Sequence, residues 1–281
     1  MQSVNEDRDL LLTDADFERI RKMIHQRAGI ALATHKREMV YSRLAKRLRV
    51  LGKQRFQDYL TILDGHDDSP EWEHFTNALT TNLTSFFREA HHFPILAEHV
   101  QKQTSPVKLW CCAASTGEEP YSLAMTLQEA LGSRASSSHI VATDIDTRAL
   151  AAAKAGIYPV SQASKLSSER LKRFFMKGTG AREGMARVNP SLRDMIEFEQ
   201  LNLLAPRWDI KGPFDAIFCR NIMIYFDKPT QKKILERFVP LLKPGGLLFA
   251  GHSENFTYIT QAFRLRGHTV YELAEAGRAS A

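Results

Sequence analysis

Apolar and polar positions follow a helical period over the first part of the chain. The spacing predicts helices within residues 14–63, with Asp14 as the N-cap of the first, and another helix at about 71–79. In the segment 36–51, apolar residues form one stripe and basic residues lie mostly opposite it. We therefore expect an all-helical N-terminal domain over residues 10–75.

The pattern changes after residue 106, where runs of consecutive apolar residues alternate with helical segments. Such runs are typical of strands buried on both faces, and they occur at Val107–Ala113, Ile140–Asp144, Met195–Phe198, Phe214–Cys219 and Leu247–Ala250. The helical segments lie at about 118–131, 147–155 and 229–242. This alternation predicts a parallel α/β sheet with right-handed crossovers, closed by an antiparallel hairpin at 263–273.

One stretch inside the second domain, which we place at 76–281, breaks this alternation. Residues 160–194 are rich in serine and glycine and carry only short alternating pieces. We expect them to form a small inserted subdomain between a helix and the next strand.

Composition places the chain among ordinary globular proteins. It has 281 residues, 43% of them hydrophobic and 25% charged, and no run reaches the ~18 apolar residues of a membrane span. The N-terminal segment is polar and lacks the basic and apolar regions of a signal peptide, so we expect a cytoplasmic protein. The three cysteines have no zinc spacing, and the adjacent His91 and His92 cannot share one helical face, so we expect no metal site.

The net charge of +6 comes from one segment. Residues 36–55 carry eight basic residues against the single acidic Glu38, a local charge of +7, so the rest of the chain is about neutral. The basic residues are Lys36, Arg37, Arg43, Lys46, Arg47, Arg49, Lys53 and Arg55. A compact basic patch of this kind favours an acidic partner, either a protein surface or a nucleic acid.

A loop of small residues, AASTGEEP, follows the first buried strand at 113–120. Small residues there let the backbone approach a ligand at the carboxyl edge of a sheet, but the glycine pattern is not that of a phosphate-binding loop. Glu118 and Glu119 would repel a phosphate and suit a cationic group such as an amine, and their alternative role is to complement the helix dipole. The spacing leaves both roles open.

Polar residues also follow two other strands. Asp144 ends the second strand, where an acidic residue commonly binds ribose hydroxyls, whereas Asp146 fits the N-cap of the next helix better. Arg220 and Asn221 follow the fourth strand, with Tyr225 shortly after them. All of these positions fall at the carboxyl edge of the predicted sheet, where ligands bind in open α/β folds.

In combination, five stretches resemble the CheR family of bacterial chemotaxis receptor methyltransferases. They are TTNLTSFFRE, AASTGEEPYS, ATDID, FDAIFCRNIMIYF and LLKPGGLLFAGHSEN, and the similarity extends over about residues 14–274. Members of this family use S-adenosylmethionine to esterify glutamate side chains of chemoreceptors, leaving S-adenosylhomocysteine. The resemblance implies a Rossmann-like methyltransferase sheet with a small β-subdomain, together with an all-α N-terminal domain.

The resemblance also implies site residues. Cofactor contacts are expected from Asn82, Thr84, Arg88, Ala113, Glu119, Asp144, Asn202, Leu203, Arg220 and Asn221. Arg88 and Tyr225 are expected at the site of methyl transfer. A glutamate carboxylate is already an anionic nucleophile at neutral pH, and a sulfonium methyl group is electrophilic, so no strong general base is needed. Arg88 would hold the substrate carboxylate, and Tyr225 would orient it or line the methyl path.

Two surfaces are expected to bind the receptor. One is the basic helix, through Arg43, Lys46, Arg47 and Arg49. The other is the β-subdomain, which in some family members holds a pentapeptide at the receptor C-terminus, with expected contacts at Lys177, Gly178, Gly180, Gly184 and Arg187. Glycines would let a peptide strand pair with an exposed edge, and Arg187 would bind a peptide carboxylate. The alternative is a surface hairpin whose glycines serve turns.

Two other functions compete with this interpretation. The basic helix suits a nucleic-acid methyltransferase, although no aromatic platform for single strands accompanies it, and the position after the fourth strand lacks the Asn/Asp-Pro-Pro-Tyr pattern used on base amines. The second alternative is an adaptor that senses the cofactor without turnover, and the presence of Arg88 and Tyr225 counts against it. We expect a monomer recruited to membrane receptor arrays, with neither nucleic-acid binding nor membrane insertion.

Overall fold

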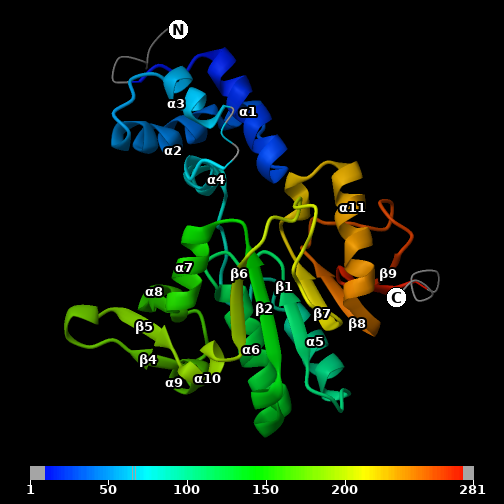
Figure 1. The fold of residues 1–281 in the computed structure, drawn as a ribbon. Helices are drawn as coiled ribbons and strands as arrows, with labels where there is room; N and C mark the ends of the chain where they lie inside the picture. Colours follow the sequence, from blue (N-terminus) through cyan, green and yellow to red (C-terminus); the bar gives the residue numbers. More distant parts are fainter. Residues whose placement is uncertain (1–9, 65, 67, 275–281) are drawn as a thin grey trace. The chain divides into compact units, whose positions relative to one another are not determined.

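The computed structural model describes residues 10–64, 66 and 68–274 (Figure 1). The chain divides into two compact units, Met1–Thr81 and Asn82–Ala281. Within the first unit the structure has the helices α1 (Asp14–Ala28), α2 (Arg37–Val50), α3 (Phe56–Leu63) and α4 (Glu71–Leu79), with the 3-10 turn η1 (Thr34–Lys36) before α2. Among the described residues, no helix is both long enough and apolar enough to span a membrane.

The start of α1 is fixed by Thr13 rather than by Asp14. The Thr13 hydroxyl accepts the Asp16 N–H at 3.1 Å, and the Asp16 carboxylate accepts the Thr13 N–H at 3.1 Å. The prediction of Asp14 as the N-cap is therefore wrong by one position. A reciprocal capping box needs an acidic or amide side chain three residues after the cap, and only the Thr13 position provides one.

Helix α2 turns part of its basic side towards its own unit. Arg47 forms a two-bond ion pair with the buried Glu71 on α4, at 2.5 and 2.7 Å, and the Tyr59 hydroxyl donates to the same carboxylate at 2.9 Å. Arg43 donates to the carbonyl oxygen of Thr80 at 2.5 Å. Lys46 is exposed. The basic helix therefore combines arginines that hold the unit together with a lysine that faces solvent.

The second unit is built on a seven-stranded sheet. Its strand order is β6-β2-β1-β7-β8-β10-β9. The first five of these pair in parallel, whereas β10 runs antiparallel to both β8 and β9, so the predicted parallel sheet with a closing hairpin is confirmed. The strands are β1 (Lys108–Cys111), β2 (His139–Asp144), β6 (Ile196–Gln200), β7 (Phe214–Cys219), β8 (Leu242–Ala250), β9 (Phe263–Gly267) and β10 (Val270–Leu273).

Both faces of this sheet are covered, which explains why its strands read as continuous apolar runs. Alternate strand residues point to opposite faces. On one face, Cys111 and Phe218 belong to a core shared with α5 (His92–Gln101) and α6 (Glu118–Leu131). On the other, Cys112 and Cys219 belong to a core shared with α11 (Lys228–Phe238). The unit also contains α7 (Thr147–Ala155) and the 3-10 turns η2 (Gly132–Ser137), η4 (Met223–Tyr225) and η5 (Val239–Leu241).

Helix α11 ends at Phe238, four residues before the predicted end at 242. The next three residues form η5, and β8 already begins at Leu242 rather than at Leu247. Pro240 explains the difference, because it has no N–H to donate to the preceding helical turn. The residues around Pro240 are apolar both at the end of the helix and at the start of β8, so the apolar pattern alone predicts the boundary between them wrongly.

Residues after α7 form a separate three-stranded antiparallel sheet, in the order β3-β5-β4. The Gly178 N–H donates to the carbonyl of Met185 at 2.8 Å, and a Cβ at Gly178 would overlap the carbonyl oxygen of Arg182. Gly180 and Gly184 have φ of +56° and +83°. These three glycines therefore shape the β4–β5 hairpin. The β-subdomain that contains this small sheet consists of β3 (Ile157–Pro159), α8 (Val160–Ala163), α9 (Ser168–Phe174), β4 (Phe175–Lys177), η3 (Gly180–Arg182), β5 (Met185–Val188) and α10 (Pro190–Arg193).

Candidate active site

The carboxyl ends of the parallel strands meet at one edge of the sheet, and polar residues follow them there. β2 ends at Asp144, and β7 ends directly before Arg220. The loop after β1 leads to Glu119 in the first turn of α6, and the loop after β8 contains Glu254. The segment 82–91, which precedes α5, contributes further contacts to this edge.

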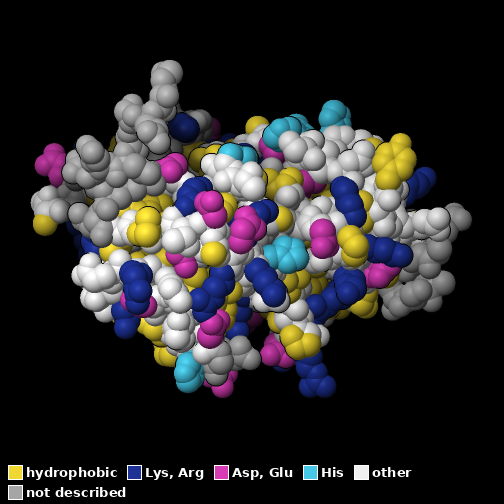
Figure 2. Space-filling model, turned by 90° about the horizontal axis from the view of Figure 1, so that it is seen from above, with side chains coloured by type: hydrophobic (Ala, Val, Ile, Leu, Met, Phe, Trp, Pro, Cys, Tyr) yellow, Lys and Arg dark blue, Asp and Glu magenta, His cyan; other side chains and the backbone are white. Residues whose placement is uncertain are grey.

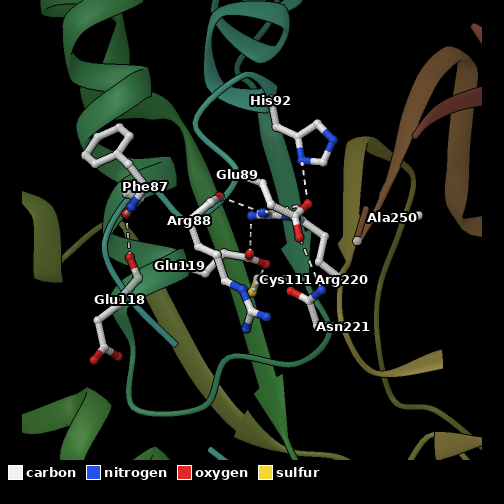
Figure 3. A network of polar contacts seen from close by, with 12 residues as sticks. Phe87, Arg88, Glu89, His92, Cys111, Glu118, Glu119, Arg220, Asn221 and Ala250 are labelled. Carbon is white, nitrogen blue, oxygen red and sulfur yellow. Dashed lines mark hydrogen bonds and ion pairs between the residues drawn. The ribbon is translucent and has the colours of Figure 1, made fainter. Parts of the chain in front are cut away.

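Arg220 is the centre of this arrangement (Figure 3). Its side chain is 1% exposed and forms ion pairs with Glu119 at 2.5 Å and Glu89 at 3.2 Å, and it donates to the carbonyl oxygen of Arg88 at 2.6 Å. Burial alone would lower the pKa of Arg220, but the charges of Glu119 and Glu89 outweigh it and raise that pKa. Breaking such a buried pair by removing one partner costs about 3–5 kcal/mol.

Glu89 is a site residue that the sequence did not single out. One carboxylate oxygen, Oε1, faces His252 Nδ1 at 3.1 Å and accepts from the Asn221 amide at 3.2 Å. Burial alone would raise the pKa of Glu89, but the bond from His252, the Arg220 charge and the Asn221 amide lower it to about 2. Glu89 is therefore ionised at neutral pH. Its partners lie far away in the chain, so no local spacing could have revealed it.

The two glutamates at the start of α6 have different surroundings. Glu119 points towards Arg220 and also accepts from the Cys111 thiol at 3.4 Å. Glu118 is buried and accepts from the Thr116 hydroxyl at 2.6 Å, and burial raises its pKa. Of the pair, Glu119 is the one that belongs to the charged network.

Asp144 and Asp146 connect neighbouring loops. Asp146 caps α7 by accepting the N–H groups of Arg148 and Ala149 at 3.0 and 3.1 Å, so the predicted N-cap is confirmed. Asp144 accepts the N–H groups of Ser115 at 2.7 Å and Asp146 at 2.9 Å, and burial raises its pKa. The loops after β1 and β2 are thus joined through Asp144.

The other predicted cofactor residues lie in loops of the same unit. The Asn82 amide donates to Asp146 at 2.8 Å. Asn202 accepts the Leu204 N–H at 2.9 Å in the loop after β6, and Leu203 beside it is buried. Thr84 and Ala113 are half-buried, in the segment before α5 and in the loop after β1. Their roles towards a cofactor stay predictions.

The loop after β7 is held by Glu254, a second residue that the sequence did not single out. Its buried carboxylate accepts backbone N–H groups from Asn221, Met223 and Gly251, at 2.9, 2.8 and 2.6 Å. Asn221 has a φ of +56°, and a Cβ on Gly251 would overlap the Asn221 amide. Glu254 and Gly251 therefore keep Asn221 in a conformation that non-glycine residues seldom adopt.

Arg88 and Tyr225, the predicted catalytic pair, are more accessible than Arg220. Arg88 is half-buried and uses Nη1 to donate to the carbonyl oxygen of Leu83 at 2.7 Å. A guanidinium has five N–H donors, so this contact leaves others for a ligand. Tyr225 is half-buried at the end of η4, the turn that follows the loop held by Glu254.

Replacing Glu254 tests this account of the loop. Glu254→Gln puts an amide N–H₂ against backbone donors, so we expect a loss of about 3 kcal/mol in the free energy of unfolding. Scanning calorimetry should show the melting temperature falling by about 5–10 °C. Glu236→Gln, at an exposed carboxylate, is the control and should melt close to the wild type. Equal melting of the two variants would contradict the role given to Glu254.

Comparisons with known proteins agree with this architecture. Residues 15–80 match the family description "CheR methyltransferase, all-alpha domain", and residues 82–272 match "CheR methyltransferase, SAM binding domain". The chain is 59% identical to the chemotaxis protein methyltransferase of Klebsiella aerogenes, with 95% of this chain and 92% of that protein covered. It is 55% identical to the protein of the same name from Escherichia coli, with 95% and 93% covered. The chain therefore belongs to the CheR family of S-adenosylmethionine-dependent methyltransferases.

Proposed function

We propose that the chain esterifies glutamate side chains of bacterial chemoreceptors. The observation that supports this most is the contrast between two arginines at the carboxyl edge. Arg220 is buried and shared by two glutamates, whereas Arg88 is half-buried and retains donors for a further ligand. A partly exposed guanidinium beside a methyltransferase site is suited to a carboxylate substrate.

The residues at this edge suit S-adenosylmethionine. That cofactor carries a sulfonium and an amine, and the edge offers the carboxylates of Glu119 and Asp144 rather than a basic phosphate cradle. Glu119 would face the cationic part, Asp144 the ribose hydroxyls, and the loop with Asn202 and Leu203 the adenine. When bound, the cofactor supplies an electrophilic methyl group.

The chain then has to position the nucleophile rather than to activate it. A glutamate side chain has a reference pKa of about 4.3, so it arrives as a carboxylate and gives up no proton. Arg88 would orient one carboxylate oxygen, and Tyr225 would orient the other or line the path. Exclusion of water and in-line alignment are the remaining requirements.

Label transfer tests the proposed reaction. Receptor membranes incubated with the chain and methyl-labelled cofactor should gain label that alkali releases as volatile methanol. Arg88→Ala should slow this transfer about a hundredfold, because a charge-assisted contact to the nucleophile is lost. Arg88→Lys should be intermediate, because it keeps the charge but loses the planar fork.

Arg134→Ala is the matched control, since Arg134 is exposed and donates to the carbonyl oxygen of Gln103, away from the carboxyl edge. It should transfer label at the wild-type rate. Label that is stable to alkali, or that appears in nucleic acid, would favour another methyltransferase activity. Cofactor binding without any transfer would favour a sensor or adaptor.

The basic helix α2 would bind the acidic methylation region of the receptor. On the face seen in Figure 2, outside the grey residues, Lys and Arg side chains lie among Asp and Glu side chains. Lys46 and Arg49 are exposed, whereas Arg43 and Arg47 bond within their own unit.

Charge reversal of the exposed pair tests this surface. Lys46→Glu with Arg49→Glu should raise KM for receptor about fivefold and leave cofactor affinity unchanged, because like charges slow the encounter. The effect should shrink as salt rises. Lys211→Glu with Lys233→Glu makes the same change in net charge at exposed positions of the second unit. If both pairs behave alike, α2 has no specific part in binding.

The β-subdomain would hold the receptor C-terminus and so keep the enzyme at receptor arrays. β4 pairs with β5 on one side only and ends the sheet order, which leaves an edge for an added strand. Arg187 is exposed and lies opposite the exposed Met176 in the β4–β5 register. A cation beside an apolar side chain suits a short peptide with an aromatic residue and a carboxylate.

Calorimetry with C-terminal pentapeptides of the organism's own receptors tests the tether. At least one peptide ending in an aromatic residue should bind with micromolar affinity, and Arg187→Glu should weaken it about tenfold or more through charge repulsion. Arg182→Glu, in the η3 turn, should bind like the wild type. Gly178 is unsuitable for mutation, since any side chain there disrupts the hairpin. Failure of every such peptide would contradict the tether.

A further inference from the structure

Three histidines, His91, His92 and His252, have ring nitrogens near Glu89, and the ring of a fourth, His268, packs against His91. His91 directly precedes α5 and His92 begins it, His252 follows β8, and His268 lies in the β9–β10 turn. The ring centroids of His91 and His92 are 4.2 Å apart, and those of His91 and His268 are 5.8 Å apart. The two rings meet although the backbone of His91 already has helical angles, with φ of −64° and ψ of −20°.

The tautomer of His92 is fixed by its surroundings. Its Nε2 lies 2.8 Å from the carbonyl oxygen of His268, and a carbonyl only accepts, so Nε2 carries the hydrogen. An unperturbed histidine has a pKa of about 6.5, so a ring with its hydrogen on Nε2 is mostly neutral at pH 7. The other nitrogen, Nδ1, therefore presents a lone pair. It is fully buried and has no hydrogen-bond partner.

The lone pair of His92 Nδ1 faces a carboxylate oxygen, Glu89 Oε2 (Figure 3). The two atoms lie 3.8 Å apart, and Oε2 is also buried without a hydrogen-bond partner. Oε2 also forms an ion pair with Arg220 Nη2 at 3.2 Å. Two buried acceptors aimed at each other are unfavourable unless a proton or a cation lies between them.

We propose that Glu89, His91 and His92 form a binding site for a zinc ion. One ligand atom from each of the three lies within 4.8 Å of the others, and the 3.8 Å spacing is near the ~3.4 Å between ligands of tetrahedral zinc. Two imidazoles and one carboxylate suit zinc better than the harder magnesium or calcium. Water would take the fourth position, on the exposed side of His91.

The charge balance favours a cation despite the nearby arginine. Glu89 and Glu119 share the single guanidinium of Arg220, so the three groups together carry one negative charge. Zinc bound at Oε2 would compete with Arg220 for that oxygen and disturb the contact between Glu89 and Asn221. Zinc occupancy should therefore inhibit the enzyme reversibly. The site itself rests on this geometry and not on the proposed substrate.

Zinc titration of the untagged full-length chain tests the site. Competition with a chromogenic chelator should show one zinc bound per chain with micromolar affinity. Cobalt at the same site should give the visible absorption of a tetrahedral ion. His91→Ala removes an exposed ligand and should weaken zinc binding about 10–100-fold and abolish the cobalt spectrum. Without added metal, that variant should retain wild-type cofactor binding and methyl transfer.

His74→Ala is the matched control, because His74 is exposed on α4 in the other unit. It should bind zinc like the wild type. Equal zinc affinity of the wild type and His91→Ala, or a wild type that binds no zinc at micromolar concentrations, would overturn the proposal. Because the main readout is metal binding, these outcomes are distinct from a failure of receptor methylation.

Discussion

The buried guanidinium of Arg220 is the interaction on which the site depends. It follows β7 and is held by Glu119 from α6 and by Glu89 from the segment before α5. It also bonds to the backbone of Arg88. Two segments far apart in the sequence, the one before α5 and the start of α6, are thereby fixed to the end of β7. Each pairing needs the other because an unpaired buried charge is costly. Precise placement of Arg88 is a consequence of this charge network.

The same edge relies on backbone conformations that are rare for residues other than glycine. Phe87 and Glu89 have φ of +51° and +52°, and Asn221 has +56°. Such conformations persist only where the surroundings over-determine them. Here the buried carboxylate of Glu254 and the Asn221–Glu89 contact fix the loop after β7, while Arg220 fixes the segment that contains Glu89. Strain and charge pairing are therefore located in the same few residues.

The sequence predicts the sheet well because a strand that is buried on both faces is a run of consecutive apolar residues. All six residues of Phe214–Cys219 are buried. The charged network has no periodic signal in the sequence, because Glu89 and Glu254 contact residues that are distant along the chain and come close only in the folded protein. For the same reason the sequence predicts that all the basic residues of α2 form one binding surface, although Arg47 is paired with the buried Glu71 inside its unit. Long-range pairing of charges is the information that periodicity lacks.

Arg220 and Arg88, the two arginines at the carboxyl edge, have different electrostatic roles. A site that binds a cationic cofactor needs negative charge, yet a carboxylate substrate is repelled by it. Arg220 neutralises one of the two charges of Glu119 and Glu89 and is too buried to bind the substrate itself. Under the proposed function, the attraction for the substrate then falls to Arg88, which is half-buried and whose guanidinium donates to the carbonyl oxygen of Leu83. A weaker hold at Arg88 keeps the carboxylate nucleophilic, because a tightly paired oxygen has less charge to donate to the methyl carbon.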